Sequence, residues 1–192
     1  APCKHWLDPA AGHWCLQPNE WIHWRNPDLV LVTNSKIARG LWFFLAALLV
    51  VIADQTAKDA AIAFLQPRVS YEFMGNLVRL FLTYNDSAAF SIGFGQTWIF
   101  TIISAAAALA LLWYRTRIQT LGWALLAGTA LGGVTGNLID RLSRAPGFPA
   151  GQVVDFIQIP FNFPIFNIAD SAICIVAVIV VIQIARGRKL GG

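Results

Sequence analysis

The sequence predicts an all-α membrane protein with a small β element: four transmembrane helices, both termini in the cytoplasm, and a small extracytoplasmic β-cradle between the first two spans. Hydrophobic residues make up 57% of the 192 residues and charged residues only 12%. Soluble domains carry about 25% charged residues, so lipid is the expected solvent. The apolar residues also collect in four long segments, which fits a bundle of spanning helices.

Each of the four segments is long enough to cross a hydrocarbon core of roughly 30 Å, which takes about 20 helical residues. Helices are expected because a spanning segment must satisfy its own backbone hydrogen bonds. The first segment does not resemble a cleaved leader, since Val51-Ile52-Ala53 is a poor cleavage site and apolar sequence resumes at Ala60. The segments run from Leu41 to Leu65, Trp98 to Tyr114, Leu121 to Ile139 and Ile165 to Ala185.

Basic residues predict how these spans are oriented, because cytoplasmic loops are enriched in Lys and Arg. Lys and Arg lie before the first span, between the second and third, and after the fourth: Lys36, Arg39, Arg115, Arg117, Arg186, Arg188 and Lys189. Both termini are therefore predicted to be cytoplasmic. Every acidic residue after Asp28 then falls at the opposite face: Asp54, Asp59, Glu72, Asp86, Asp140, Asp155 and Asp170.

The two outer connections differ from each other. In the first, about 66–97, Val78, Leu80 and Leu82 alternate with other residues, a period typical of a half-buried strand, and Gly93 and Gly95 supply turns. We expect a small sheet resting on the membrane. The second, about 142–164, is rich in Pro and Gly and predicts an irregular loop, with a short helix or strand around 153–159.

Residues 1–35 stand apart from the domain predicted over residues 36–192. They hold all three His and four of the eight Trp, and Cys3-Lys4-His5 with His13-Trp14-Cys15 has a spacing that can bind zinc. We favour the simpler interpretation, a poorly ordered extension, and expect no metal site and no cofactor. The three cysteines make no disulfide framework.

Polar residues inside the third and fourth spans are the main signal for function, because such groups face a bundle interior or a water cavity. Asn137 and Arg141 are four residues apart, and Asn167 and Asp170 are three apart, so each pair shares a helix face. Asp170 is predicted to lie about five residues, or roughly 7.5 Å, inside its span. The alternative is that the two Asn side chains only hydrogen-bond helices together.

Glycines at 128, 132 and 136, with Gly133 beside them, form a small-residue stripe on the third span. Such a stripe lets another helix approach closely. We expect this packing to hold Asn137 and Arg141 near the fourth span.

With other catalytic groups excluded, the membrane region offers carboxylates for catalysis. All three His precede Trp24, so no Ser-His or Cys-His pair is available in the membrane region. A short loop can bring Asp155 and Asp170 together. Two carboxyls that share a site do not both ionise readily, so one keeps a proton. The ionised partner then accepts a proton from water while the protonated one polarises a scissile carbonyl.

The chain resembles the bacterial lipoprotein signal peptidases, the type II signal peptidases, in five motifs that follow one another in the same order. The resemblance covers about residues 37–186. Its motifs are Asp54-Gln55 with Lys58, Asn85 to Phe90, Gly132 to Arg141 (GGVTGNLIDR), Val153 to Phe156 (VVDF) and Phe166 to Asp170 (FNIAD). One departure stands out, since Ser87 replaces a Gly that is usual in the family. A Gly there can serve a positive φ, so the shape of that turn is less certain.

The resemblance implies an intramembrane aspartyl endopeptidase of the bacterial cytoplasmic membrane, with its active site at the extracytoplasmic face. It would cleave diacylglyceryl-modified prolipoproteins just before the lipidated Cys. The other implied partners are membrane lipids and a globomycin-type inhibitor, with no nucleic acid. The implied catalytic residues are Asp155 and Asp170; the implied substrate-binding residues are Asn85, Asn137, Arg141 and Asn167; Asp54, Lys58 and Asp140 support them, with Asp140 steadying Arg141.

Two alternatives belong to other functional classes. A proton-coupled transporter also places acids in the membrane, but a relay should distribute titratable groups across the bilayer depth, and the inner half of every predicted span lacks them. A non-catalytic membrane scaffold is the second alternative, and the complete motif set argues against it.

Overall fold

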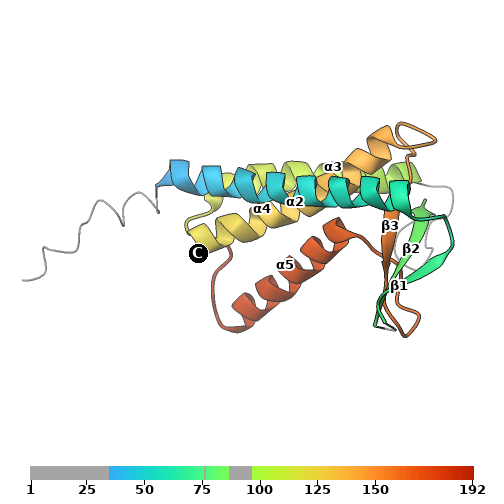
Figure 1. Ribbon diagram of the computed structural model, residues 1–192. Helices are drawn as coiled ribbons and strands as arrows, with labels where there is room; N and C mark the ends of the chain where they lie inside the picture. Colours follow the sequence, from blue (N-terminus) through green and yellow to red (C-terminus); the bar gives the residue numbers. More distant parts are fainter. Residues whose placement is uncertain (1–34, 76, 87–96) are drawn as a thin grey trace, which may run out of the picture.

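The computed structural model describes residues 35–75, 77–86 and 97–192, and Figure 1 shows an up-and-down helical arrangement with a small sheet at one end. Helix α4 packs against each of the other three long helices. The helices are α2 (Lys36–Phe64), α3 (Thr97–Tyr114), α4 (Leu121–Ser143) and α5 (Ile168–Ala185), with a short 3-10 helix η3 (Arg115–Arg117) after α3. The strands are β1 (Ser70–Met74), β2 (Val78–Asn85) and β3 (Val153–Gln158).

Three of the described helices are long and apolar enough to cross a membrane: Lys36–Phe64, Thr97–Arg117 and Ile168–Ala185. Helix α4 matches the third predicted span in position but carries the glycine stripe and several polar residues. Its buried residues include Gly128, Gly132, Asn137 and Asp140, so much of its surface faces protein. The prediction of four spans therefore stays a prediction.

The helix surfaces fit a lipid solvent. Helix α2 exposes Leu41, Leu48 and Leu49, each more than half accessible. Its buried residues form one stripe whose second half includes two charged side chains: Phe43, Ala47, Asp54, Lys58 and Ala61. Large apolar groups outside and polar groups inside are expected where the surroundings are hydrocarbon. This second half of the stripe lies beside the sheet.

The sheet has the order β1-β2-β3 with both pairs antiparallel. Strand β2 confirms the strand predicted from the alternation at Val78–Thr83. The prediction that the sheet forms only between the first two spans was incomplete, because β3 comes from the second outer connection, where 153–159 was left open between helix and strand. Its residues Val153 to Phe156 are buried. Pairing with β2 and contact with α2 and α4 favour an extended strand here.

The start of α5 corrects the predicted depth of Asp170. The apolar run begins at Ile165, but Asn167 has an extended backbone and caps the helix, so α5 starts at Ile168. Asp170 is the third helical residue and lies in the first turn, not five residues inside the helix. A side chain placed there can still contact groups that precede the helix.

The glycine stripe makes the close helix contacts that the sequence predicts. A Cβ at Gly128 would collide with the carbonyl oxygen of Phe43, and one at Gly132 would lie 2.6 Å from that of Ala47, both on α2. On the other side of α4, a Cβ at Gly133 would lie 2.6 Å from the carbonyl oxygen of Ala169 on α5. These contacts bring α2 and α5 against the same stretch of α4.

Several predictions concern residues outside the described ranges. The extension at residues 1–34, with its possible zinc spacing, is one of them. The turn at Ser87, Gly93 and Gly95 is another.

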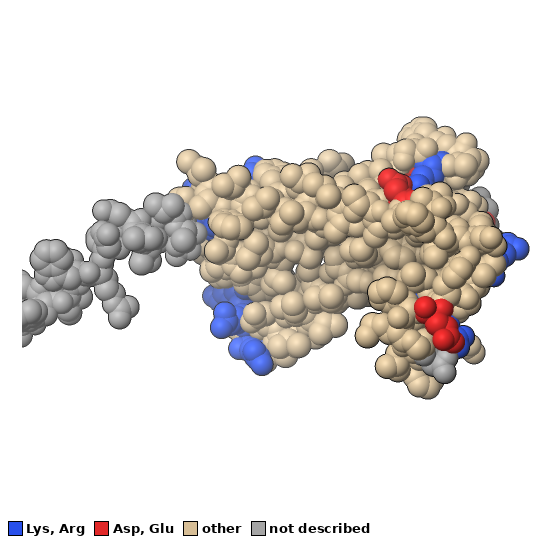
Figure 2. All heavy atoms as spheres, viewed as in Figure 1, with Lys and Arg blue, Asp and Glu red and all other residues tan. Residues whose placement is uncertain are grey.

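Charge is distributed unevenly between the two ends of the molecule. In Figure 2, acidic side chains gather at the end that carries the sheet, and basic side chains of the opposite end form a separate group. Arg144 accompanies the acids through an ion pair with Asp59. The predicted segregation of acids is thus present along the long axis.

Candidate active site

Asp155 is held by the sheet and by the start of α5. It lies on β3 opposite Thr83 of β2, and Asn85 lies two residues further along β2, so its side chain points to the same sheet face. The amide nitrogen of Asn85 donates to Asp155 Oδ2 at 2.9 Å. The amide nitrogen of Asn167 donates to Asp155 Oδ1 at 2.7 Å. Both carboxylate oxygens therefore have a partner, and the residue is only 2% exposed.

Asp170 is positioned by a reciprocal capping box at the start of α5. Its backbone N–H donates to Asn167 Oδ1 at 2.9 Å, and its Oδ2 accepts from the Asn167 backbone N–H at 3.2 Å. The box satisfies two backbone donors of the first turn. It also fixes the orientation of the Asp170 side chain, which remains half-buried.

Two asparagine amides connect the two aspartates. Besides its bond to Asp155, Asn167 Nδ2 lies 3.1 Å from Asn137 Oδ1, and Asn137 Nδ2 donates to Asp170 Oδ1 at 2.7 Å. Asp155, Asn167, Asn137 and Asp170 thus form one continuous hydrogen-bonded row across β3, α5 and α4. Asn167 is fully buried and Asn137 is 7% exposed, so the row is rigidly packed.

Lys58 is buried next to this row and contacts several polar side chains. Its ammonium group is 2.7 Å from Asp54, 2.8 Å from Asp140 and 3.0 Å from Asn137 Oδ1. Lys58, Asp54 and Asp140 are all 0% exposed. Asn137 Oδ1 accepts from Lys58, which orients its Nδ2 toward Asp170.

Both carboxylates beside Lys58 also hold backbone. Asp54 Oδ1 accepts the backbone N–H of Ala169 at 2.9 Å, in the first turn of α5. Asp140 Oδ2 accepts the backbone N–H of Val154 at 3.2 Å, next to Asp155. Asp54 therefore fixes the segment that carries Asp170, and Asp140 fixes the segment that carries Asp155.

The resemblance implied that Asp140 steadies Arg141, and this role stays a prediction: their opposite charges attract, but Asp140 makes its described hydrogen bonds to other groups. Its Oδ1 accepts from Arg144 Nε at 2.7 Å and from Gln55 Nε2 at 3.2 Å. Neighbouring residues on a helix are about 100° apart, whereas Arg144 is four residues on and shares the face of Asp140. Arg141 donates to its own helix at the carbonyl of Asn137, at 3.3 Å.

Sequence reasoning assigned no role to Gln55 or Arg144. Arg144 also reaches Asp59 on α2 at 3.0 Å, and Gln55 also donates to the carbonyl of Gly136 at 3.1 Å. A signal for Arg144 was present in its spacing of four residues from Asp140. For Gln55 the only signal was its place in the first motif, since its partners on α4 lie more than 80 residues away in the sequence.

Electrostatics separates Asp155 from an ordinary surface aspartate. Burial, followed by the nearby charge of Asp170, raises the pKa of Asp155 from 3.8 to about 7, although hydrogen bonds from Asn85 and Asn167 and the charge of Lys58 act in the opposite direction. The carboxyl group therefore keeps its proton up to near neutral pH.

The charges in this region balance when the pair holds one proton. Four carboxylates gather here, from Asp54, Asp140, Asp155 and Asp170, with three cations from Lys58, Arg141 and Arg144. A single proton shared by Asp155 and Asp170 makes these seven side chains neutral overall. The solvent-exposed Asp59 is not counted among them. Within the described residues, no group of three His, Cys, Asp or Glu side chains is arranged to hold a metal ion.

The structure thus brings together eight of the nine predicted site residues in one hydrogen-bonded network. These are Asp54, Lys58, Asn85, Asn137, Asp140, Asp155, Asn167 and Asp170. Arg141 lies on the same helix as Asn137, half-buried, with its charge near Asp170 and Asp155 but without a described hydrogen bond to either. The roles of these residues in a reaction stay predictions.

Comparison with known proteins adds independent findings. The family model described as signal peptidase (SPase) II matches residues 46–186. The chain is 40% identical to the lipoprotein signal peptidase of Leifsonia xyli over 83% of this chain and 75% of that protein. It is 40% identical to the lipoprotein signal peptidase of Streptomyces coelicolor over 78% and 72% of the two chains. A solved structure described as a bacterial membrane enzyme matches with a TM-score of 0.67 at 29% identity, over 75% of this chain and 87% of that one.

Proposed function

Because the chain belongs to the signal peptidase II family, we propose that it is a bacterial membrane aspartyl endopeptidase that removes signal peptides from prolipoproteins. The single observation that carries the assignment of its catalytic residues is the row in which Asn167 and Asn137 join Asp155 to Asp170. The row holds the two carboxyls near each other, and their different surroundings suit different roles.

In the proposed reaction, Asp170 acts as the base and Asp155 as the acid. Asp170 lies in the first turn of α5, where the helix dipole favours a negative charge. It accepts a proton from a water molecule as the water oxygen bonds to the scissile carbonyl carbon. Asp155, whose raised pKa keeps it protonated near neutral pH, donates a proton to the carbonyl oxygen.

The resulting gem-diol then collapses. The C–N bond breaks, the amine of the departing residue takes the proton held by Asp170, and the diol returns a proton to Asp155. The products are the free carboxyl end of the signal peptide and the free amine of the mature lipoprotein. The pair thereby ends each cycle with one proton, as it began.

The substrate-binding assignments rest on position. Asn85, Asn137 and Asn167 contact the two carboxyls directly, so they lie beside the position that the scissile peptide bond would take. Arg141 is half-buried at the end of α4 nearest the site, where its guanidinium can bind peptide carbonyls. Asp54, Lys58 and Asp140 act through the segments that they hold, as positioning residues.

We propose that the chain has four spans with both termini in the cytoplasm, and that the site lies at the extracytoplasmic face of the cytoplasmic membrane. The basic ends of α2, α3 and α5 support this orientation. A substrate whose Cys carries diacylglycerol keeps its acyl chains in the bilayer, so cleavage just before that Cys suits a site at this boundary. The domain over residues 36–192 would include the sheet as a cradle, the 142–164 loop as a cover, and a pocket for a globomycin-type inhibitor.

The transporter alternative finds less support in the structure. The charged side chains that are buried, Asp54, Lys58, Asp140 and Asp155, all belong to the one network beside the sheet. Among the described residues none continues that network toward the opposite end. A relay across the bilayer would need such groups.

A cleavage assay tests the proposal and also separates it from a non-catalytic scaffold. Asp155→Asn and Asp170→Asn are each reconstituted and supplied with a diacylglyceryl-modified prolipoprotein. We expect each change to reduce the cleavage rate by about 10³-fold or more, because one partner of the proton transfer is lost. Asp59→Asn is the matched control, since Asp59 is an exposed carboxylate at the same end, and it should cleave normally. Wild-type rates in either catalytic variant would refute the assignment.

A further inference from the structure

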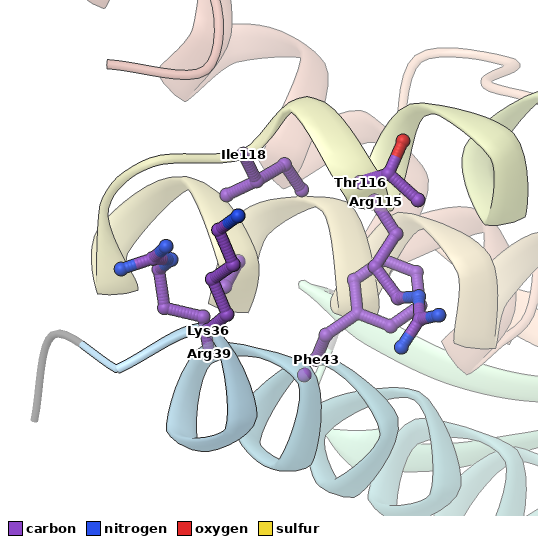
Figure 3. A pocket seen from close by; sticks show the side chains of 8 residues that line it. Lys36, Arg39, Phe43, Arg115, Thr116 and Ile118 are labelled. Atoms are coloured by element: carbon purple, nitrogen blue, oxygen red, sulfur yellow. The ribbon is translucent and has the colours of Figure 1, made fainter. Parts of the chain in front are cut away.

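A second polar site lies at the opposite end of the molecule from the aspartate pair. A cavity of about 290 Å³ is bounded by α2, η3 and the start of α4, and three basic side chains line it: Lys36, Arg39 and Arg115. We call it the basic pocket. Figure 3 shows Lys36 and Arg39 projecting from α2 on the side that faces Ile118 and Arg115. No acidic side chain of the described residues lines it.

The first turn of α2 carries positive charge, although the amino-terminal end of a helix is normally stabilised by negative charge. The helix dipole favours anions at this end, yet the turn contains no acid and carries Lys36 and Arg39. Ser35 satisfies the backbone N–H of Ala38 at 3.0 Å but contributes no charge. An anion bound here would interact favourably with both the dipole and the cations.

Arg115 is fixed in place across α2. Its guanidinium carbon lies 4.9 Å from the centroid of the Phe44 ring. The guanidinium also lies beside Gly40 of α2, where a Cβ would be 3.4 Å from one of its terminal nitrogens. An Arg held by an aromatic ring loses little freedom on binding, and its planar fork matches a phosphate group.

The interior of the basic pocket is apolar. Phe43, Ile118 and Ala124 line it together with the basic side chains. A basic rim over an apolar floor suits an amphipathic ligand that combines a phosphate with a hydrocarbon part. A free phosphate ion would use only the rim.

We propose that the basic pocket binds the headgroup of an anionic glycerophospholipid from the leaflet opposite the active site. Its phosphodiester lies between Arg115, Arg39 and Lys36, and its glycerol carbons contact the apolar floor. This site is independent of the proposed catalytic residues, so failure of either proposal leaves the other intact.

Native mass spectrometry of the delipidated full chain with added dioleoylphosphatidylglycerol tests the proposal. The pocket variant combines Lys36→Gln, Arg39→Gln and Arg115→Gln, and the matched control combines Arg186→Gln, Arg188→Gln and Lys189→Gln at the same membrane face. Because charge-assisted hydrogen bonds to phosphate are lost, the pocket variant should bind the first lipid about tenfold more weakly or worse. The control should bind it as the wild type does.

Equal weakening in both variants would mean general electrostatic attraction and would overturn the proposal. Dioleoylphosphatidylcholine should not compete, and competition by it at equal concentration would contradict the need for net negative charge. Inorganic phosphate at millimolar concentration should not displace the lipid, and displacement would identify a free-anion site instead. If the triple variant does not fold, Arg115→Lys keeps the charge and loses the fork. It should bind severalfold more weakly, and unchanged binding would also overturn the proposal.

Discussion

At the residue scale, Lys58 decides whether the acids around it can stay buried. Its ammonium contacts Asp54 and Asp140 at 2.7 and 2.8 Å, and all three side chains have no solvent exposure. A buried ion pair contributes modest net stability, but removing one partner leaves a charge without compensation in a region of low dielectric constant. Two such charges depend on Lys58.

Lys58→Met is therefore expected to destabilise the protein by about 3–5 kcal/mol, seen as a large fall in melting temperature in detergent. Lys36→Met is the control, since it removes a Lys from the same helix at a site outside the network. An unchanged melting temperature for Lys58→Met would show that Asp54 and Asp140 do not carry the charges assigned to them.

Part of this network was predictable from spacing alone. Asp54 and Lys58 are four residues apart, and so are Asp140 and Arg144. Residues at this spacing lie on the same face of a helix, so each contact could be predicted from the sequence. The contact between Lys58 and Asp140 was not predictable from spacing, because it depends on how α2 and α4 align. The contacts that Gln55 makes with α4 depend on the same alignment of the two helices.

At the scale of elements, α4 is the helix on which the site is assembled. Gly136 lies where α4 meets Asp54, and a Cβ there would be 2.6 Å from Asp54 Oδ2. Asp54 in turn holds the backbone of Ala169 in the first turn of α5. The close approach of α4 to Asp54 at Gly136 is thus linked to the position of Asp170.

Gly136→Ala should lower both the melting temperature and the cleavage rate, because Asp54 must move away from Lys58 and Ala169. Overpacking of this kind costs about 1–3 kcal/mol. Gly122→Ala on the same helix meets nothing within 4 Å, so it should be neutral or slightly stabilising, as Ala has a higher helix propensity than Gly. Equal behaviour of the two variants in both assays would contradict the packing role of Gly136.

Helix and strand boundaries show where local patterns were sufficient. The strand at Val78–Asn85 followed from alternation, and the glycine stripe on α4 followed from its four-residue period. Strand β3 did not follow, since its run Val153–Phe156 is buried and shows no alternation, and it pairs with a strand about 70 residues earlier. The first turn of α5 was misplaced because hydropathy does not register the cap at Asn167.

At the scale of the whole molecule, the two ends differ in charge and in proposed function. The sheet end holds the buried acids and the aspartate pair, and the other end holds the basic pocket. Hydropathy and charge counts predicted this polarity, because both depend only on which residues precede and follow each apolar segment. They did not predict that both outer connections contribute to a single sheet, which depends on long-range pairing.

The central claim is that Asp155 and Asp170 share one proton and work as a pair, which a pH profile of kcat/KM for prolipoprotein cleavage tests most directly. Because the pKa of Asp155 is raised to about 7, the acid is lost as the pH rises through that value, and the rate should fall on the alkaline side. At low pH both carboxyls are protonated, the base is lost, and the rate should fall again, giving a bell whose limbs belong to the pair. A rate that stays level from about pH 6 to pH 9 would contradict the claim.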